Sequence, residues 1–178
     1  EHFGTCGGCK WQYLPYAQQL RFKQQQVTDA FERIGKLALP QAGPIMASPE
    51  TRFYRNKMEY TFSATRWIAR DEPDIAPGSK EAYGLGLHVP RFFDKVVDIQ
   101  KCHLQPGPSN AIRNAIRSYA LENNYTYYHI RNHTGLLRTL IIRTSQTTGQ
   151  TLVIIVFGSA GEEDKRNALL EFVQERFP

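Results

Sequence analysis

Residues 52–66 read RFYRNKMEYTFSATR, and this stretch indicates the kind of fold. Apolar and polar side chains alternate along it, with Met58, Tyr60 and Phe62 on one side and mainly charged or hydroxyl-bearing residues on the other. A period of two is typical of a β-strand with one buried face. We therefore expect a strand over 52–66 in a sheet that is covered on one side.

Similar patterns extend over the rest of the chain. Apolar residues at helical spacing and short apolar runs predict the remaining elements. The helices are expected at about 16–34, 109–123 and 162–177, and the strands at about 82–89, 93–99, 125–131, 137–144 and 150–157. The last strand is apolar on both faces, which is typical of a central strand covered by helices. Together these patterns predict an α+β fold, with a largely antiparallel or mixed sheet and packed helices.

Composition limits the class of protein. The 178 residues carry 22 Lys and Arg against 17 Asp and Glu, a net charge of +5 that suits a polyanionic partner but is also common in ordinary soluble proteins. No apolar run approaches the length that crosses a membrane, so we expect no membrane partner. Three cysteines are odd in number and too few for a disulfide scaffold, so we expect reduced thiols and a cytoplasmic location.

Positive charge gathers at the start of the first predicted strand. Arg52, Arg55 and Lys57 lie there, and Arg55 and Lys57 fall on its polar face. An arginine fork or a lysine ammonium in such a place suits the phosphates of RNA. These residues are our candidate RNA contacts, and a solvated sheet edge is the alternative that the sequence leaves open.

The cysteines form a pattern that is typical of a metal site. Cys6 and Cys9 are separated by two glycines, and Cys102 lies far along the chain. A Cys-x-x-Cys pair can place two thiolates around one metal, and the glycines allow a tight turn. Zinc and cubane iron–sulfur sites normally take four protein ligands, so a fourth would have to come from upstream of Glu1. Spacing alone leaves zinc, an iron–sulfur centre and ordinary thiols open.

Three motifs together resemble the RNA (uracil-5-)-methyltransferase family, in the branch that carries a [4Fe–4S] cluster and leans toward 23S rRNA. They are FGTCGGCKWQYLPYAQQLRFKQQQV at 3–27, YRNKMEY at 54–60 and VDIQKC at 97–102. They occur in the family's order over the first part of the chain. The resemblance implies that Cys6, Cys9 and Cys102 hold the cluster with a fourth cysteine from outside this sequence. Whether the cluster survives without that ligand stays open.

The resemblance also implies an activity for the whole protein. The family flips a uridine out of its RNA and methylates C5 with S-adenosylmethionine. In the family, the cofactor loop, the nucleophilic cysteine and the general base lie further toward the C-terminus, and an RNA-binding barrel lies before the cluster. We therefore expect no catalytic and no cofactor-binding residues in this sequence, and no methyl transfer by these 178 residues alone.

The resemblance divides the chain into three segments. Residues 1–15 are the cysteine-bearing cluster segment, 16–48 a helix and linker, and 49–178 the central α+β domain. In the family the helix belongs to the downstream catalytic domain, so we expect its apolar face to meet a part of the protein outside this sequence. The alternative function is a non-enzymatic RNA-binding module with a structural zinc. The target uridine, rRNA against tRNA, and the oligomeric state stay open.

Overall fold

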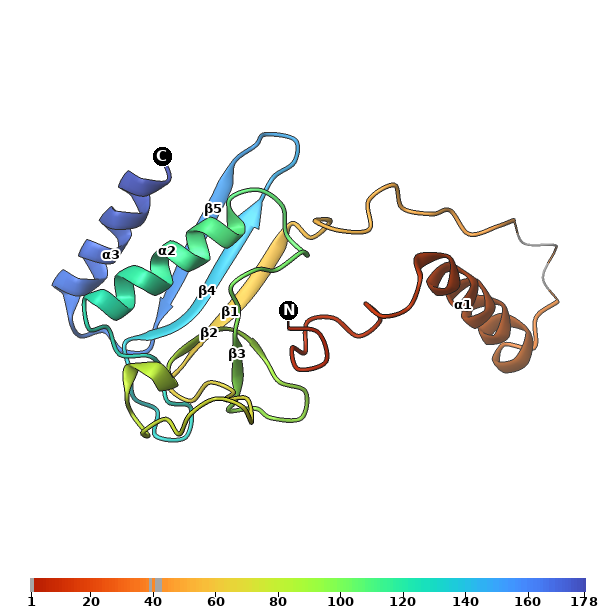
Figure 1. Ribbon diagram of the computed structural model, residues 1–178. Coiled ribbons are helices and arrows are strands. Elements are labelled where there is room, and N and C mark those ends of the chain that lie inside the picture. The colour runs from red at the N-terminus through yellow and green to blue at the C-terminus, as the bar shows by residue number, and fades with distance from the viewer. Residues whose placement is uncertain (1, 39, 41–42) are drawn as a thin grey trace. The chain divides into compact units, whose positions relative to one another are not determined.

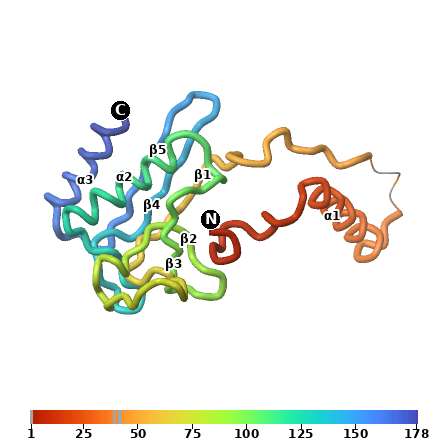
Figure 2. The backbone as a smooth tube through the Cα atoms, viewed as in Figure 1, coloured from red at the N-terminus to blue at the C-terminus, as the bar shows by residue number. Residues whose placement is uncertain are grey.

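The computed structural model describes residues 2–38, 40 and 43–178, which fall into two compact units (Figures 1 and 2). The larger unit comprises Glu1–Gly8 and Arg52–Pro178, and the smaller unit comprises Cys9–Thr51. No helix in the described ranges is both long and apolar enough to cross a bilayer. The segments predicted from the family resemblance are not tested by this division and stay predictions.

The smaller unit contains one long helical segment. Helix α1 (Tyr16–Asp29) continues into the π-helical turn η1 (Ala30–Ile34), which confirms the helix predicted at 16–34. The Gln19 side chain donates to the carbonyl oxygens of Trp11 and Leu14, at 3.2 and 2.8 Å, and so ties the preceding turn to the helix. No residue of α1 is buried. Its stability within this unit therefore owes little to apolar packing.

The larger unit is built on a five-stranded antiparallel sheet in the order β3-β2-β1-β4-β5. The strands are β1 (Lys57–Ser63), β2 (Gly84–His88), β3 (Val96–Asp98), β4 (Leu137–Thr144) and β5 (Thr151–Phe157). A short 3₁₀ turn, η2 (Lys80–Ala82), precedes β2. With the helices described next, this sheet confirms the predicted α+β class.

Helices α2 (Ser109–Glu122) and α3 (Glu163–Arg176) pack side by side over the sheet (Figure 1). Their contact includes the stacked rings of Tyr119 and Phe172, whose centroids are 4.2 Å apart. The apolar side chains of β1 and β4 face α2 and form the core. Its fully buried members include Tyr60, Phe62, Ile112, Ile116, Leu140 and Ile142.

The first strand is shorter than predicted. β1 begins at Lys57, and residues 52–56 are irregular. The N–H groups of Phe53 and Arg55 donate to the carbonyl oxygens of His103 and Leu104, at 2.7 and 2.8 Å, instead of to a neighbouring strand. Phe53 also has a φ of +56°, which breaks an extended run. The side-chain alternation at 52–56 therefore did not indicate a strand.

Two further strand predictions are wrong in part. The segment predicted as a strand at 125–131 makes only isolated bridges, Tyr127 with Leu137 and His129 with Thr134. β5 exists as predicted but lies at the edge of the sheet instead of its centre. Its side chains Leu152, Ile154 and Val156 are 54%, 39% and 37% exposed. An apolar pattern on both faces of a strand does not reveal which neighbours the strand has.

Candidate metal centre and RNA surface

The glycines between Cys6 and Cys9 allow a close approach to the sheet. The Gly7 N–H donates to the His88 carbonyl oxygen at 3.0 Å, and a Cβ at Gly7 would lie 2.6 Å from that same oxygen. A Cβ at Gly8 would lie 2.6 Å from Leu87 Cδ1. Both distances are shorter than real Cβ contacts, so side chains at these positions would displace the segment. The backbone at residues 7–8 therefore lies directly on the end of β2.

Cys6 and Cys102 meet the same small part of the core. Each is half-buried and packs against the buried cluster of Val89, Val97 and Ile99. The larger unit therefore brings together two predicted ligands that are far apart in the sequence. This placement fits a shared centre, because ligands of one metal site must lie around a common point.

The third predicted ligand belongs to the other unit. Cys9 is half-buried and is the first residue of Cys9–Thr51. Across the part of the chain that the structure describes, no group of three or more His, Cys, Asp or Glu side chains is arranged to hold a metal ion. The metal role of Cys6, Cys9 and Cys102 therefore stays a prediction.

The loop that carries Cys102 is fixed by the first turn of α2. The Asn110 side chain accepts the Cys102 N–H at 2.8 Å and donates to the Cys102 carbonyl oxygen at 2.9 Å. A side-chain amide is suited to this because it offers one acceptor and two donors. These two bonds fix the backbone at the predicted ligand.

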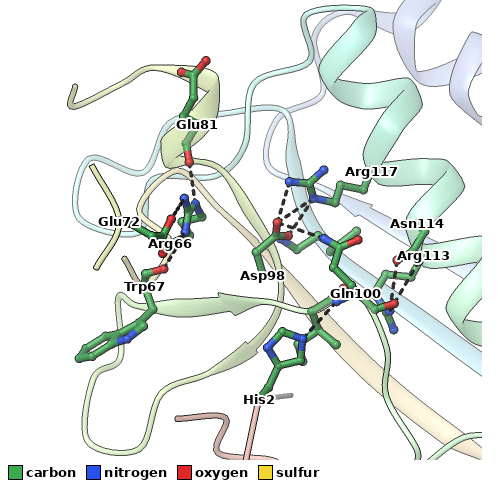
Figure 3. A network of polar contacts seen from close by, with 12 residues as sticks. His2, Arg66, Trp67, Glu72, Glu81, Asp98, Gln100, Arg113, Asn114 and Arg117 are labelled. Atoms are coloured by element: carbon green, nitrogen blue, oxygen red, sulfur yellow. Dashed lines mark hydrogen bonds and ion pairs between the residues drawn. The ribbon is translucent and has the colours of Figure 1, made fainter. Parts of the chain in front are cut away.

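A buried arginine holds the same loop from inside (Figure 3). Arg113 of α2 has no exposed surface, and its guanidinium donates to the carbonyl oxygens of Ile99 and Gln100, at 3.0 and 2.7 Å. It also donates to Asn110 Oδ1 at 3.0 Å and to Asn114 Oδ1 at 3.2 Å. No carboxylate of the described residues forms an ion pair with it. The loop thus lies against a buried positive charge. Burial of a charge costs free energy unless the group is well hydrogen-bonded, as this guanidinium is.

Tyr60 packs against this arginine. Its ring lies 5.1 Å from the Arg113 guanidinium carbon, and its hydroxyl lies 3.4 Å from the Ser109 hydroxyl. Burial raises the pKa of Tyr60, the Ser109 hydrogen bond and the Arg113 charge oppose that rise, and Cys102 adds to it. The 5.1 Å separation makes the Arg113 guanidinium a direct neighbour of this buried phenol.

The three candidate RNA contacts do not share one strand face. Arg52 and Arg55 lie in the irregular segment before β1, and Lys57 is the first residue of β1. All three are exposed, and the Lys57 ammonium lies 3.6 Å from a Glu59 carboxylate oxygen. Their exposure allows contact with phosphate, and their role in RNA binding stays a prediction.

Sequence reasoning missed a basic neighbour of Lys57. Arg143 of β4 lies directly opposite Lys57 in the β1–β4 register, and both side chains are exposed. Both also line an open groove of about 1310 Å³ that extends to the β4–β5 turn and the end of α3. The alternation of 137–144 could have placed Arg143 on a polar face, but the partner strand and register cannot be inferred from spacing alone.

Asn110 and Arg113 were also missed. Both lie in a helix that was predicted correctly, and Arg113 is adjacent to the core residue Ile112. An arginine beside an apolar helix face is usually expected to reach solvent. The spacing of apolar residues does not distinguish an arginine that reaches solvent from one whose guanidinium is buried against a loop.

No protein-family model matches the chain. The chain is nevertheless similar along its length to proteins named uncharacterized RNA methyltransferases. Those of Bacteroides thetaiotaomicron and Porphyromonas gingivalis are each 47% identical, over 180 and 182 residues, covering 100% and 99% of this chain and 39% of each relative. That of Chlorobaculum tepidum is 38% identical over 175 residues, covering 98% of this chain and 35% of the relative. The chain thus spans about two fifths of the length of the curated relatives it matches.

A solved structure has a similar fold. It is the Pyrococcus abyssi tRNA (uracil-54, C5)-methyltransferase in complex with S-adenosyl-L-homocysteine. The TM-score is 0.62 at 23% sequence identity, and the match covers 91% of this chain and 34% of that one. At this level of identity the likeness establishes a shared fold.

Proposed function

We propose that this chain is the central part of an S-adenosylmethionine-dependent RNA (uracil-5-)-methyltransferase. The observation that carries the proposal is 47% identity, over essentially the whole chain, to two proteins named as RNA methyltransferases. The fold shared with a tRNA uracil methyltransferase supports the uracil C5 chemistry. Because the chain spans about two fifths of those relatives, the activity is proposed for the whole protein.

The substrate within this class is proposed to be 23S rRNA. The support is the combination of Cys-Gly-Gly-Cys at 6–9 with YRNK at 54–57, which resembles the cluster-bearing branch of the family. The solved structure with a similar fold is a tRNA enzyme, so tRNA is the competing outcome of the test. A cytoplasmic location is proposed with it, since three cysteines are too few for a disulfide scaffold and suit a reducing compartment.

Cys6, Cys9 and Cys102 would supply three of the four ligands of a [4Fe–4S] cluster, with the fourth from outside this sequence. When bound, the cluster would cross-link the N-terminal segment to the sheet, because methylation of uracil needs no redox step. The residues of this chain prepare that site: Asn110 fixes the backbone of Cys102, and Arg113 places a positive charge near it. Thiolate-bound clusters are anionic, so a nearby cation is favourable.

The RNA-facing residues are proposed to be Arg52, Arg55 and Lys57, with Arg143 added by the strand register. Each exposed cation can displace a counterion from the phosphate backbone. The groove that Lys57 and Arg143 line offers a path for one strand of that backbone.

The proposed activity is tested with the full-length protein, labelled S-adenosylmethionine and unmodified 23S rRNA or tRNA. We expect label at C5 of uracil in the rRNA, with the tRNA unlabelled. Residues 1–178 alone should transfer no methyl group and should not bind the cofactor by calorimetry. A full-length protein that binds the cofactor but labels neither RNA would overturn the proposed activity.

Metal analysis tests the cluster separately. Anaerobically prepared full-length protein should contain iron and sulfide at about four each per chain. Cys102→Ser should lose most of the iron while the helical signal in circular dichroism persists. One zinc per chain, together with no methyl transfer, would favour the non-enzymatic module instead.

A further inference from the structure

The loop between β2 and β3 exposes two consecutive phenylalanines beside positive charge. It comprises residues 89–95, and its Phe92 and Phe93 are 47% and 63% exposed. Three cations lie in it or against it, Arg91, Lys95 and Arg131, with a single carboxylate, Asp94, beside them. We infer that this loop is a stacking platform for unpaired bases of the RNA substrate. The inference rests on the proposed RNA substrate and adds a second surface to the candidate contacts at 52–57.

The platform has a defined geometry. The Arg131 guanidinium carbon lies 5.0 Å from the centroid of the Phe93 ring. Asp94 holds that guanidinium in place, because its Oδ2 accepts from Arg131 Nε at 2.9 Å and from Nη2 at 2.8 Å. The same arginine lowers the pKa of Asp94, so the carboxylate is charged at neutral pH. One face of Phe93 is thus supported by a cation, and the ring remains mostly exposed.

The backbone of the loop is also fixed. The Phe92 N–H donates to the Val89 carbonyl oxygen at 3.1 Å, which closes a tight turn, and the Thr65 hydroxyl donates to the Asp94 carbonyl oxygen at 2.7 Å. Arg91, the third residue of the turn, has a φ of +72°, a conformation that residues with side chains rarely adopt. Glycine would fit this position without strain, and such outliers cluster at binding sites.

The base of the platform rests on the cysteine-bearing side of the core. Phe92 makes an edge contact with Trp67 at 5.5 Å between ring centroids, and Trp67 packs on the core cluster shared by Cys6 and Cys102. A Cβ at Gly7 would lie 3.6 Å from the Pro90 ring. Anchoring the N-terminal segment would therefore also support the loop that presents the aromatic rings.

Unpaired nucleotides match this surface better than a duplex does. A base stacks on an aromatic face only when it has left its own stack, and every base has such a face. The neighbouring cations suit the phosphates of the same nucleotides. An enzyme that acts on a flipped uridine needs its RNA locally unpaired. The platform would hold bases near the target and so favour that unpaired state.

The test measures RNA affinity of the full-length protein with Phe93→Ala, Phe93→Leu and Phe93→Tyr. The probes are a short uridine-rich single strand and a fully paired duplex of the same length. We expect Phe93→Ala and Phe93→Leu to weaken single-strand binding by about 5-fold to 150-fold, the range for losing one stacked base. Phe93→Tyr keeps a flat ring and should bind as the wild type does. Duplex binding should not change.

Three controls separate the explanations. Ile154→Ala removes an exposed apolar side chain (39%) from β5, outside the lining of the groove proposed for the RNA backbone, and should leave single-strand affinity unchanged. Arg91→Gln should lower the salt dependence of binding by about one unit, whereas Phe93→Ala should leave that slope unaltered. Melting temperatures should stay close to the wild type for all of these variants, because the side chains are exposed.

Wild-type affinity in Phe93→Ala would overturn the platform, because it would show that the side chain does not contact the RNA. Wild-type affinity in Phe93→Leu alone would also overturn it, because an apolar side chain without a ring would then be sufficient. Equal weakening on the duplex would also overturn it. Failure of the proposed function looks different: the wild-type protein itself would then neither bind the single strand nor methylate RNA. A wild-type protein that methylates RNA with an unaffected Phe93→Ala variant rejects this inference alone.

Discussion

The loop that carries Cys102 and the basic segment at 52–57 lie next to each other, yet they are held in opposite ways. The Cys102 loop is fixed from the interior by Asn110 and by Arg113, which has no exposed surface. Arg55 and Lys57 are exposed, and the segment is bound to the neighbouring loop through backbone N–H groups, those of Phe53 and Arg55. Placement of the predicted ligand is therefore coupled to the stability of the fold, while the predicted RNA contacts can change with little structural cost.

The largest effect should come from Arg113→Met. This change leaves the buried Ile99 carbonyl oxygen without its side-chain donor, and leaves the Gln100 carbonyl oxygen with the Asn114 amide alone. We expect a loss of about 2–4 kcal/mol in the free energy of unfolding. Arg143→Met, at an exposed site, should change it by less than about 0.5 kcal/mol. Urea unfolding of the full-length variants measures both, and equal stability of the two would contradict the contrast drawn above.

Gly7→Ala should have the next largest effect. The new Cβ would lie 2.6 Å from the His88 carbonyl oxygen, and a backbone atom cannot move away as the end of a side chain can. We expect a loss of about 1–3 kcal/mol and less iron per chain after purification. Gly43→Ala is the matched control, because nothing lies within 4 Å of its Cβ position. Normal iron content in Gly7→Ala would show that binding of the proposed cluster does not depend on this close approach to the sheet.

A smaller, pH-dependent effect is expected at Glu72. Its carboxylate accepts from Arg66 Nη1 at 3.1 Å (Figure 3). It also accepts from the Ala69 N–H at 2.8 Å. The Arg66 hydrogen bond lowers the pKa of Glu72 from 4.5 to about 2. A lowered pKa means that the carboxylate stabilises the fold at neutral pH, and that this contribution is lost as the pH falls from about 4.5 toward 2.

Glu72→Gln should therefore lower the free energy of unfolding at pH 7 by about 1 kcal/mol or less, since the pair is partly exposed. The difference from the wild type should disappear as the pH approaches 2. Thermal melting over this pH range gives the comparison, with Glu171→Gln on the surface of α3 as the control. A difference that grows toward low pH would contradict a stabilising contribution from the charged Glu72 carboxylate.

The smallest effect on stability should come from the double variant Arg55→Gln with Lys57→Gln. Both side chains are exposed, so the free energy of unfolding should change by within about 0.5 kcal/mol. RNA titrations at several salt concentrations should show weaker binding and a slope lower by about one unit per lost phosphate contact. Arg176→Gln on α3 should leave both unchanged. Unaltered RNA binding with a lowered melting temperature would make these residues structural.

Much of the local structure could be predicted, because it depends on periodicity over neighbouring residues. β4 was predicted with the limits it has, and α2 and α3 to within a residue or two at each end. The predicted ends of an element were wrong where its backbone hydrogen bonds go to segments that are distant in the sequence. Residues 52–56 alternate as a strand does, but their N–H groups bind the loop at 103–104.

The candidate sites divide in the same way. The family resemblance implied that Cys6, Cys9 and Cys102 share one centre. The structure places Cys6 and Cys102 on one core cluster, and the metal itself is still a prediction. The sequence gives no sign that Arg113 is buried or that Arg131 lies over Phe93. Both depend on contacts between segments that are separate in the chain.

By itself, the sequence determined the α+β class, the positions of most helices and strands, the cysteine pattern and the family that it resembles. These follow from local repeats and from residue types at fixed spacings. Only the tertiary structure decided that β5 is an edge strand, that Lys57 faces Arg143, and that the loop at 89–95 presents its rings on a fixed support. Strand order, register and burial are set by which distant segments pair, and a linear pattern does not record that choice.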